Sequence, residues 1–517
     1  MNLTTGEWIP VLWDDGRTSR ASLLDAFLRG DRICDLAVRP HERVALMRLL
    51  ICIAQAALDG PRDREEWKTC RARLPAAAAD YLARWKRAFE LFGDGQRFLQ
   101  VENVKASSAR ETESDASNPP SKLDLALATG NNTTLFDNAG GSDRRFSPDD
   151  LALALLTFQN FSPGGLIGDV SWHGVSMGRS STHAPCVVRS MVHTYIVRSS
   201  LVDGICANML SAEEVNLMGA EWGRPVWEWM PDGPKCGREV GNATRSYLGR
   251  LVPLSRALRL DSHGTRMILG KALDYDPTWR EAAATWVLRE RNGEMERMPL
   301  SASLSKGLWR DAHAIAVAAA AERQALGGPL AMMSSAETAA ATDVWCGALV
   351  ANKSKLIDTV ESVLHIPAPM FADRGQRLYR QGVEEAERWG RRIGGAVAAY
   401  RRAMKDDLER KESRIRGILV KRKAATHYWT AVEQKLSLLL GLLDDPSPLR
   451  PDGAEQDRWG ATGWGRALAA AAREAYEMAC PRETPRQLRA YAAGMSALFA
   501  ARRGEGDGAD SPEESEE

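Results

Sequence analysis

The chain has 517 residues, enough for two to four domains of about 150 residues each. Hydrophobic residues make up 44% of the sequence and charged residues 26%, which is typical of a folded protein and excludes a wholly disordered or fibrous one. Lys and Arg total 68, as do Asp and Glu, so the formal net charge is zero and the chain as a whole carries no electrostatic footprint for a nucleic acid.

Three properties of the sequence predict a soluble, cytoplasmic protein. The first residues lack a basic segment followed by an apolar one, so they do not resemble an export signal. No apolar run approaches the roughly 20 residues that cross a bilayer. The eight cysteines are scattered without a CxxC pair, so we expect reduced thiols and no zinc, other metal or cofactor.

The first hundred or so residues are predicted to mix strands and helices. Residues 8–13 (Trp-Ile-Pro-Val-Leu-Trp) predict a strand, and Asp-Asp-Gly at 14–16 predicts the turn after it. Apolar residues recur at helical spacing from 41 to 58, which indicates a buried helix that ends before Asp-Gly-Pro. Residues 106–121 are almost without apolar side chains, so we expect a mobile surface loop there.

Residues 161–179 contain five glycines and one proline. Glycine at this density permits positive φ angles and the close approach of another backbone. The segment is therefore either an ordered binding loop or a flexible connector, and its composition fits both.

Further along the chain, residues 247–298 are predicted to favour strands. Residues 251–254 are expected to form one strand, and residues 285–298 a hairpin around Asn292 and Gly293. Two closely spaced prolines at 367 and 369 mark a domain boundary. Four amphipathic helices with short connections follow them, a pattern typical of an up-and-down bundle.

These elements predict an α+β fold in three parts. A large mixed domain would span residues 1–366 and a four-helix bundle residues 367–503. Residues 504–517 are expected to be a disordered acidic tail, since they contain seven acidic residues and no basic ones.

One formal match to a catalytic motif is present, Gly-Val-Ser-Met-Gly at 174–178. Such a nucleophile elbow needs a buried strand before the serine and a helix after it. The flanking residues here predict neither. We therefore expect no catalytic residue and no enzyme, with a serine hydrolase that uses Ser176 as the alternative.

The distribution of charge is uneven within the helical region. Residues 370–429 contain 16 Lys and Arg against 8 Asp and Glu, a net charge of +8. This excess fits solvated helices with salt-bridging neighbours and a phosphate-binding surface about equally well. A third explanation also fits this excess: the protein could be a protein-only scaffold whose arginine-rich helices bind acidic partner proteins.

Three short features favour a DNA-contacting protein over an enzyme. Residues 352–355 (Asn-Lys-Ser-Lys) place small polar and cationic groups where they could reach a groove edge. Arg289 and Arg291 lie near the expected hairpin tip, and the glycines at 164–168 could admit a sugar-phosphate backbone. Each feature also has an ordinary explanation: a helix start, a solvated turn and a flexible loop.

Several strings occur together in a particular order. They are Trp-Ile-Pro-Val at 8–11, Leu-Leu-Ile-Cys-Ile-Ala-Gln at 49–55, Phe-Leu-Gln at 98–100, the Asn-rich stretch at 131–140, and Leu-Leu-Thr-Phe-Gln-Asn-Phe-Ser-Pro-Gly-Gly at 155–165. With the C-terminal bundle after them, the chain resembles the CasA family, the large subunits of the type I-E CRISPR surveillance complex Cascade.

The resemblance implies a non-catalytic DNA-recognition subunit. Such a protein recognises the protospacer-adjacent motif on duplex DNA, starts target unwinding, and supports R-loop formation and recruitment of a helicase-nuclease. Its partners would be the other Cascade subunits, the guide RNA, double-stranded target DNA and that helicase-nuclease, without a membrane. The family reads the motif largely from the minor groove, where base patterns are degenerate.

The resemblance also implies DNA-binding positions in the first half of the chain. Phe136 and Asn138 match a loop that engages the guide end and the motif-proximal DNA. The family's glycine loop corresponds to Gly164, Gly165 and Gly168, and which of these approaches the DNA is left open.

Two further elements carry over with a change of residue type. Arg291 falls where the family places a minor-groove lysine, with Arg289 as its rival. Asn352, Lys353 and Ser354 match the element that inserts at the motif. Where one member has a glutamine wedge between asparagine and alanine, this chain has Lys353 and Ser354, so whether Lys353 acts as the wedge is open. A lysine stem could fill space under the last base pair while its ammonium contacts a phosphate.

Overall fold

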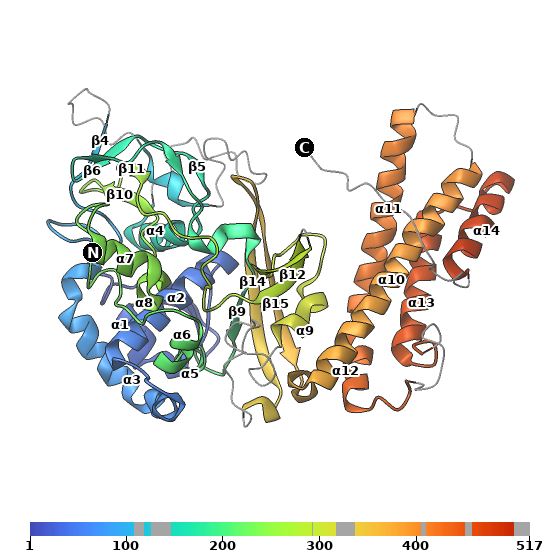
Figure 1. The fold of residues 1–517 in the computed structure, drawn as a ribbon, viewed down its shortest axis with the longest axis horizontal. Coiled ribbons are helices and arrows are strands. Elements are labelled where there is room, and N and C mark those ends of the chain that lie inside the picture. The colour runs from blue at the N-terminus through green and yellow to red at the C-terminus, as the bar shows by residue number, and fades with distance from the viewer. Residues whose placement is uncertain are drawn as a thin grey trace. The chain divides into compact units, whose positions relative to one another are not determined.

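The computed structural model describes residues 1–107, 118–125, 146–291, 293–316, 337–404, 410–449 and 458–500, with Arg291 and residues 410–416 described by their backbone alone. The chain divides into two compact units, Met1–Phe371 and Ala372–Glu517 (Figure 1). The first unit mixes helices and strands and the second is helical, which confirms the predicted α+β class.

The N-terminal unit begins with a small antiparallel sheet. Its central strand β1 (Ile9–Trp13) pairs with β2 (Thr18–Ala21) on one side and β3 (Ile33–Leu36) on the other, which confirms the predicted strand. The side chain of Ser22 caps the short helix α1 (Leu23–Leu28) that follows.

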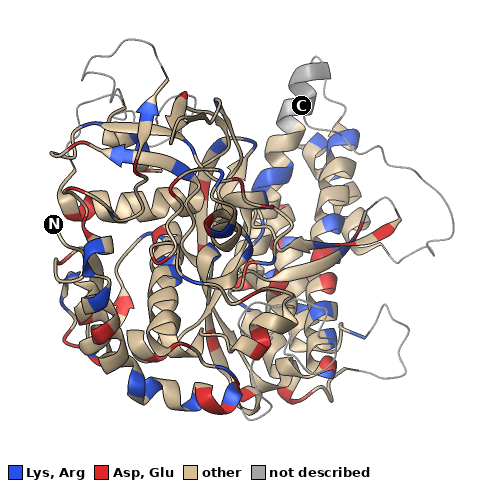
Figure 2. Cartoon of the chain, turned by 60° about the vertical axis from the view of Figure 1, so that its left-hand side comes forward, with Lys and Arg blue, Asp and Glu red and all other residues tan. Residues whose placement is uncertain are grey.

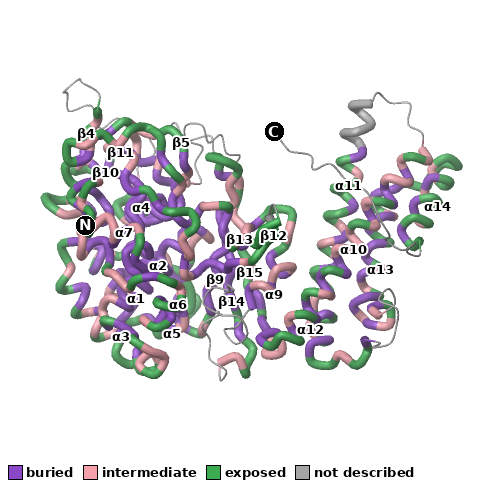
Figure 3. Tube along the Cα trace, viewed as in Figure 1, coloured by how far each residue is buried: buried purple, intermediate pink, exposed green. Residues whose placement is uncertain are grey.

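Two buried helices form the centre of this unit. Helix α2 (Pro40–Leu58) is buried along most of its length, as its apolar residues predict, and α3 (Arg64–Arg84) packs against it. Helix α4 (Pro148–Phe161) begins with Ser147 as its cap and is buried from Leu151 onward. Figure 3 shows α2 and α4 as largely buried segments in the interior of the unit.

Short elements surround these helices. The strands are β4 (Val104–Ala106), β5 (Gly165–Leu166), β6 (Val170–Trp172), β7 (Val175–Ser176), β8 (Ser180–Ser181), β9 (His193–Ile196), β10 (Arg256–Leu260) and β11 (Met267–Lys271). The helices are α5 (Leu201–Ala207), α6 (Ala212–Leu217), α7 (Gly237–Arg245), α8 (Tyr247–Leu251) and α9 (Ala312–Ile315). The predicted strand at 251–254 is wrong: Ser246 caps α8 through the Gly249 N–H (3.2 Å), and Leu251 ends that helix.

Two hairpins complete the unit. The first, β12 (Trp286–Arg291) and β13 (Glu294–Pro299), confirms the predicted hairpin, and Asn292 in its turn lies outside the described residues. The second is longer and joins β14 (Thr342–Asn352) to β15 (Lys355–Ile366). Strand β14 also pairs with β9, so three strands form the sheet β15-β14-β9.

Part of the expected surface loop at 106–121 lies outside the described residues. At its C-terminal end the chain is packed: Asn118 pairs with Met267, and Ser121 is wholly buried beside the core. The predicted acidic tail, residues 504–517, also lies entirely outside the described residues.

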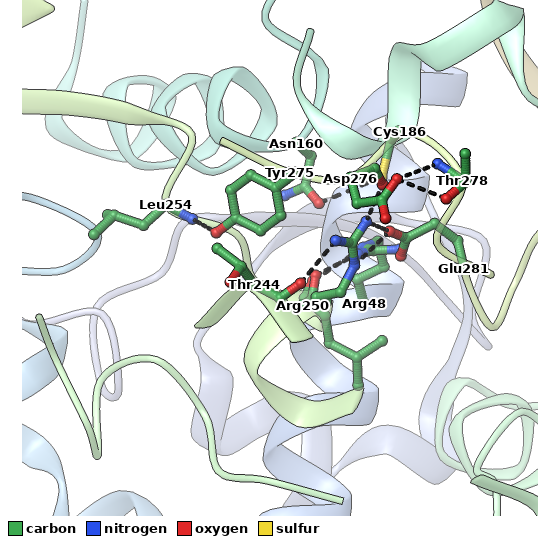
Figure 4. Close-up of polar contacts among 11 residues, drawn as sticks. Arg48, Asn160, Cys186, Thr244, Arg250, Leu254, Tyr275, Asp276, Thr278 and Glu281 are labelled. Carbon is green, nitrogen blue, oxygen red and sulfur yellow. Dashed lines mark hydrogen bonds and ion pairs between the residues drawn. The ribbon is translucent and has the colours of Figure 1, made fainter. Parts of the chain in front are cut away.

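A buried ion network joins distant parts of the N-terminal unit, as Figure 4 shows. The carboxylate of Glu281 lies between two arginines, with Arg48 at 2.9 Å and Arg250 at 2.5 Å, and all three side chains are at most 3% exposed. Arg48 also donates to the carbonyl oxygen of Leu251, and Arg250 to that of Thr244. The network therefore ties α2 and α8 to the segment that leads into β12.

The C-terminal unit consists of α10 (Asp373–Met404), α11 (Arg410–Glu433), α12 (Leu436–Asp444), α13 (Gly463–Ala479) and α14 (Pro485–Phe499). Helix α10 packs against each of the other four. The short α12 follows α11 almost directly. The sequence pattern does not separate these two helices, so it predicts four helices where the described structure has five. In the described part of the chain, no helix is long and apolar enough to cross a membrane.

Candidate nucleic-acid interface

The residues at 352–355 form the tip of the long β14–β15 hairpin. Asn352 pairs with Lys355, so Lys353 and Ser354 make a two-residue turn. Lys353 has a φ of 53°, a left-handed conformation that hairpin turns more often give to Asn or Gly. The alternative explanation of these residues as a helix start is therefore wrong.

The hairpin tip is exposed but firmly held at its base. Residues 352–355 are exposed, whereas Leu356 is buried in the core. The N–H of Ala351 donates to the hydroxyl of Ser190 (2.9 Å). Ser190 and its neighbour Arg189 both have left-handed φ angles, 51° and 53°; the Ser190 hydroxyl lies against the hairpin, whereas Arg189 is exposed.

The glycine loop, residues 164–168, lies against this tip. Gly165 has a φ of 130°, and a Cβ atom at this position would lie 3.3 Å from the Ser354 hydroxyl. The loop is hydrogen-bonded on its other side, because β5 pairs with β8. Two features that are some 190 residues apart in the sequence are thus brought together (Figure 1).

Close packing of the glycines favours the ordered loop over the flexible connector. A Cβ at Gly164 would lie 3.0 Å from the His183 N atom, and one at Gly168 would overlap the carbonyl oxygen of Leu269 in β11. Neither position has room for a larger residue without displacement of backbone. The backbone conformation at Gly165 likewise disfavours other residues.

A buried arginine supports the loop from beneath. The Arg256 guanidinium is 1% exposed and donates to the carbonyl oxygens of Pro163 (2.8 Å) and Thr182 (2.9 Å). Burial lowers the pKa of Arg256 to about 10, so the group keeps its charge at neutral pH. Burial and this nearby charge also lower the pKa of His183, whose unprotonated Nδ1 accepts a hydrogen bond from the Gly164 N–H (3.1 Å).

Cations surround the loop and the hairpin tip. Lys353 and Lys355 lie at the tip, Arg189 precedes the serine that holds it, and Arg179 adjoins the loop through a hydrogen bond from Ile167 N–H to its carbonyl oxygen. None of these four forms an ion pair with any residue that the structure describes. Charges of both signs are interspersed over the molecule (Figure 2), and the site differs in that its unpaired cations lie beside an exposed hairpin tip and a glycine loop.

Arg289 lies on the other hairpin. It is exposed, and its cross-strand partner in β13 is Glu296, while Arg291 is opposite Glu294. The base of this hairpin is joined to the segment that holds the β14–β15 tip, because Ala302 N–H donates to the Ser190 carbonyl oxygen (2.9 Å). The acidic residues opposite both arginines reduce the net positive charge there. The Arg291 side chain lies outside the described residues, as do Phe136 and Asn138.

Ser176 does not occupy a nucleophile elbow. It lies in β7, which pairs with β6 around a turn at His173 and Gly174, and the short strand β8 follows instead of a helix. The strand-to-helix turn that exposes such a serine is therefore missing at this position.

Two buried histidines flank the end of α4, directly before the glycine loop. The rings of His41 and His193 lie 6.1 and 5.8 Å from the ring of Phe161. Burial lowers the pKa of His41 to about 4 and that of His193 to about 3. Both rings are therefore neutral in the folded protein at pH 7.

We expect these histidines to make the fold sensitive to acid. The unfolded chain binds their protons near pH 6.5 and the folded chain only below about 4, so the free energy of unfolding falls as the pH drops through this window, by roughly 1.4 kcal/mol per pH unit for each histidine. Urea midpoints at pH 7 and 5 would measure the loss. In a His41→Leu/His193→Leu variant the difference between the two midpoints should shrink, and an unchanged difference would assign the acid sensitivity to other groups.

Comparison with known proteins gives concordant results. The model of the family "CRISPR-associated protein Cse1" matches residues 2–475. The CasA/Cse1 protein of Thermus thermophilus is 29% identical over 329 residues, which are 60% of this chain and 59% of the relative. The chain thus matches less than two thirds of that relative's length.

Solved structures share the fold over nearly the whole chain. Thermus thermophilus CasA superposes with a TM-score of 0.72 at 20% identity, over 96% of this chain and 98% of that one. Cse1 from Acidimicrobium ferrooxidans gives 0.72 at 18% identity, over 96% of each chain. A chain of a CRISPR RNA-guided surveillance complex gives 0.69 at 16% identity, over 97% and 99%.

Proposed function

Because this chain belongs to the CRISPR-associated protein Cse1 family, we propose that it is the large subunit of a type I-E CRISPR RNA-guided surveillance complex. In this role it recognises the protospacer-adjacent motif on duplex DNA, starts unwinding beside it, and supports R-loop formation and recruitment of the helicase-nuclease. The chain would act by binding, without catalysing a reaction itself.

One observation carries the DNA-binding part of this proposal. The glycine loop lies beside the exposed tip of the β14–β15 hairpin, and four cations without ion-pair partners among the described residues surround them. Glycines leave a strip of backbone that a sugar-phosphate chain can approach, and unpaired cations attract its phosphates. The tip itself ends in an exposed two-residue turn, Lys353 and Ser354.

The proposed mechanism follows from this arrangement. Phosphate contacts from the cations hold the duplex in register, and the hairpin tip enters the groove beside the motif. Unstacking a base step costs a few kcal/mol, which wedge insertion and guide pairing offset. The Lys353 stem is exposed and long enough to fill the space beneath the last base pair, with its ammonium free to reach a phosphate.

Alanine variants of the hairpin tip test the proposal. We expect Lys353→Ala, and likewise Asn352→Ala, to weaken motif-dependent binding roughly fivefold, the effect of about 1 kcal/mol, while complex assembly is unchanged. The measurement is the affinity of the reconstituted complex for duplexes that differ only in the motif.

Two controls make the result specific. Lys355→Ala removes a cation from the same hairpin but from a regular strand position, so it should lower affinity for all duplexes alike and leave motif discrimination intact. Lys353→Asn keeps a residue that tolerates the left-handed turn and should still lose affinity. Unchanged target binding in both alanine variants would contradict the assignment, and binding without a steep dependence on salt would favour the protein-only scaffold.

A further inference from the structure

The C-terminal unit contains a groove of about 610 Å³ between the start of α10 and the segment that follows α12. Three arginines line it: Arg374 and Arg377 from α10, and Arg458 from the chain before α13. We call these residues and the space between them the arginine groove. Its only acidic lining residue among those described is Asp445.

Among the residues that the structure describes, the arginines of this groove have no ion-pair partner. Arg374 and Arg377 are exposed. The Nε atom of Arg458 is buried and has no hydrogen-bond partner in the described structure. Asp445 is engaged by its own turn, where it accepts a hydrogen bond from Ser447 N–H (3.0 Å). The described part of the groove therefore presents three cations to an anionic occupant.

The chain supplies an anionic segment of fitting charge. Residues 504–517 contain seven acidic residues and no basic ones. Charge complementarity between seven carboxylates and the three arginines that line the groove favours their association, because Arg binds carboxylates in a bidentate fashion.

The acidic segment, residues 504–517, is long enough to reach the arginine groove from the end of α14. The end of α14 lies beside the middle of α10, where Trp389 contacts Phe499 and Arg392 donates to the Ala500 carbonyl oxygen (3.4 Å). Arg374 is 18 residues, or five helical turns, before Arg392, so both lie on the same side of α10 about 27 Å apart. The 17 residues after Ala500 span roughly 55–60 Å when extended, about twice that distance.

We propose that residues 504–517 of this chain bind the arginine groove of its own helical unit. A tethered segment of this length acts at an effective concentration of roughly millimolar, so even weak ion pairs keep the groove occupied. While bound, the segment neutralises arginines that would otherwise attract phosphates. The residues of the arginine groove belong to the C-terminal unit and those of the proposed motif site to the N-terminal unit, and the inference does not depend on the proposed function.

A labelled peptide tests the proposal. The probe is a fluorescent synthetic peptide of residues 504–517, and its anisotropy reports binding to the full chain or to the chain truncated after Arg503. We expect the peptide to bind the truncated chain at least tenfold more tightly than the full chain, whose own segment competes. Binding should weaken severalfold between 50 and 200 mM salt, concentrations over which screening becomes strong.

Groove variants locate the binding surface. In the truncated chain, Arg374→Gln/Arg377→Gln/Arg458→Gln should abolish peptide binding. A matched control, Arg473→Gln/Arg482→Gln, removes two arginines of the same unit that instead pair with Glu477, and should leave binding unchanged. Circular dichroism confirms that both variants are folded.

Three outcomes would overturn the proposal. Equal peptide binding by the full and truncated chains would show that the segment does not compete for the site. Equal binding by the groove and control variants would place the peptide elsewhere. Failure of the truncated chain to bind the peptide, combined with groove-dependent binding of a 20-bp duplex, would make the arginine groove a nucleic-acid site.

Discussion

Replacement of Glu281 by alanine is expected to lower the free energy of unfolding of the N-terminal unit by about 3–5 kcal/mol. Glu281 lies between Arg48 and Arg250, and all three side chains are almost wholly inaccessible to solvent. Burial alone would raise the pKa of Glu281, but the guanidiniums of Arg250 and Arg48 outweigh burial and hold that pKa below its usual range. Without the carboxylate, two buried positive charges would face each other uncompensated.

The measurement is chemical denaturation at pH 7, followed by tryptophan fluorescence. Glu281→Gln separates charge from packing: it keeps the volume and a hydrogen-bond acceptor, so a loss close to that of Glu281→Ala would assign the effect to charge. The control is Glu65→Ala, which breaks the exposed ion pair with Lys68 on α3 and should change stability far less. A Glu281→Ala variant as stable as Glu65→Ala would show that the network contributes little.

Sequence analysis predicts well those elements whose conformation is determined by residues close together in the sequence. Helix α2 has apolar residues on every side because it is buried on every side, and the β12–β13 hairpin carries Asn-Gly in its turn. The β14–β15 turn has no such signal, since Lys-Ser does not ordinarily adopt the left-handed conformation found at Lys353. That turn is imposed by the strands on either side, and β14 is in turn held by β9.

The candidate site was predictable one piece at a time, but its assembly was not. Composition and resemblance pointed to the glycine loop and to residues 352–354, yet nothing local indicates that Gly165 lies beside Ser354. Arg189 and Ser190 were missed because their left-handed backbone has no residue signature. Arg256 was missed because arginine is rarely buried, and the carbonyl oxygens that hold it come from two loops far away in the sequence.

The second large effect, on the order of the glycine loop and on DNA affinity, is expected when the buried Arg256 is replaced. Arg256→Met keeps an apolar stem in β10 but removes the only side-chain donor that joins the carbonyl oxygens of Pro163 and Thr182 in the described structure. Each buried carbonyl left unsatisfied costs about 1–3 kcal/mol, so the backbone on both sides of the glycine loop should open towards water. We expect faster hydrogen exchange at residues 162–183 and, in the reconstituted complex, at least tenfold weaker binding to the motif duplex.

A neighbouring arginine supplies the matched control. Arg259 lies on the same strand, is more exposed, and donates to the Gly95 carbonyl oxygen (3.2 Å), away from the loop. Arg259→Met should therefore leave both hydrogen exchange at 162–183 and DNA affinity near the wild-type values. Faster exchange without weaker binding in Arg256→Met would mean that the glycine loop is ordered for stability alone. Weaker binding without faster exchange would mean that the buried charge itself attracts the DNA backbone, because the loop would then be intact and only the local potential changed.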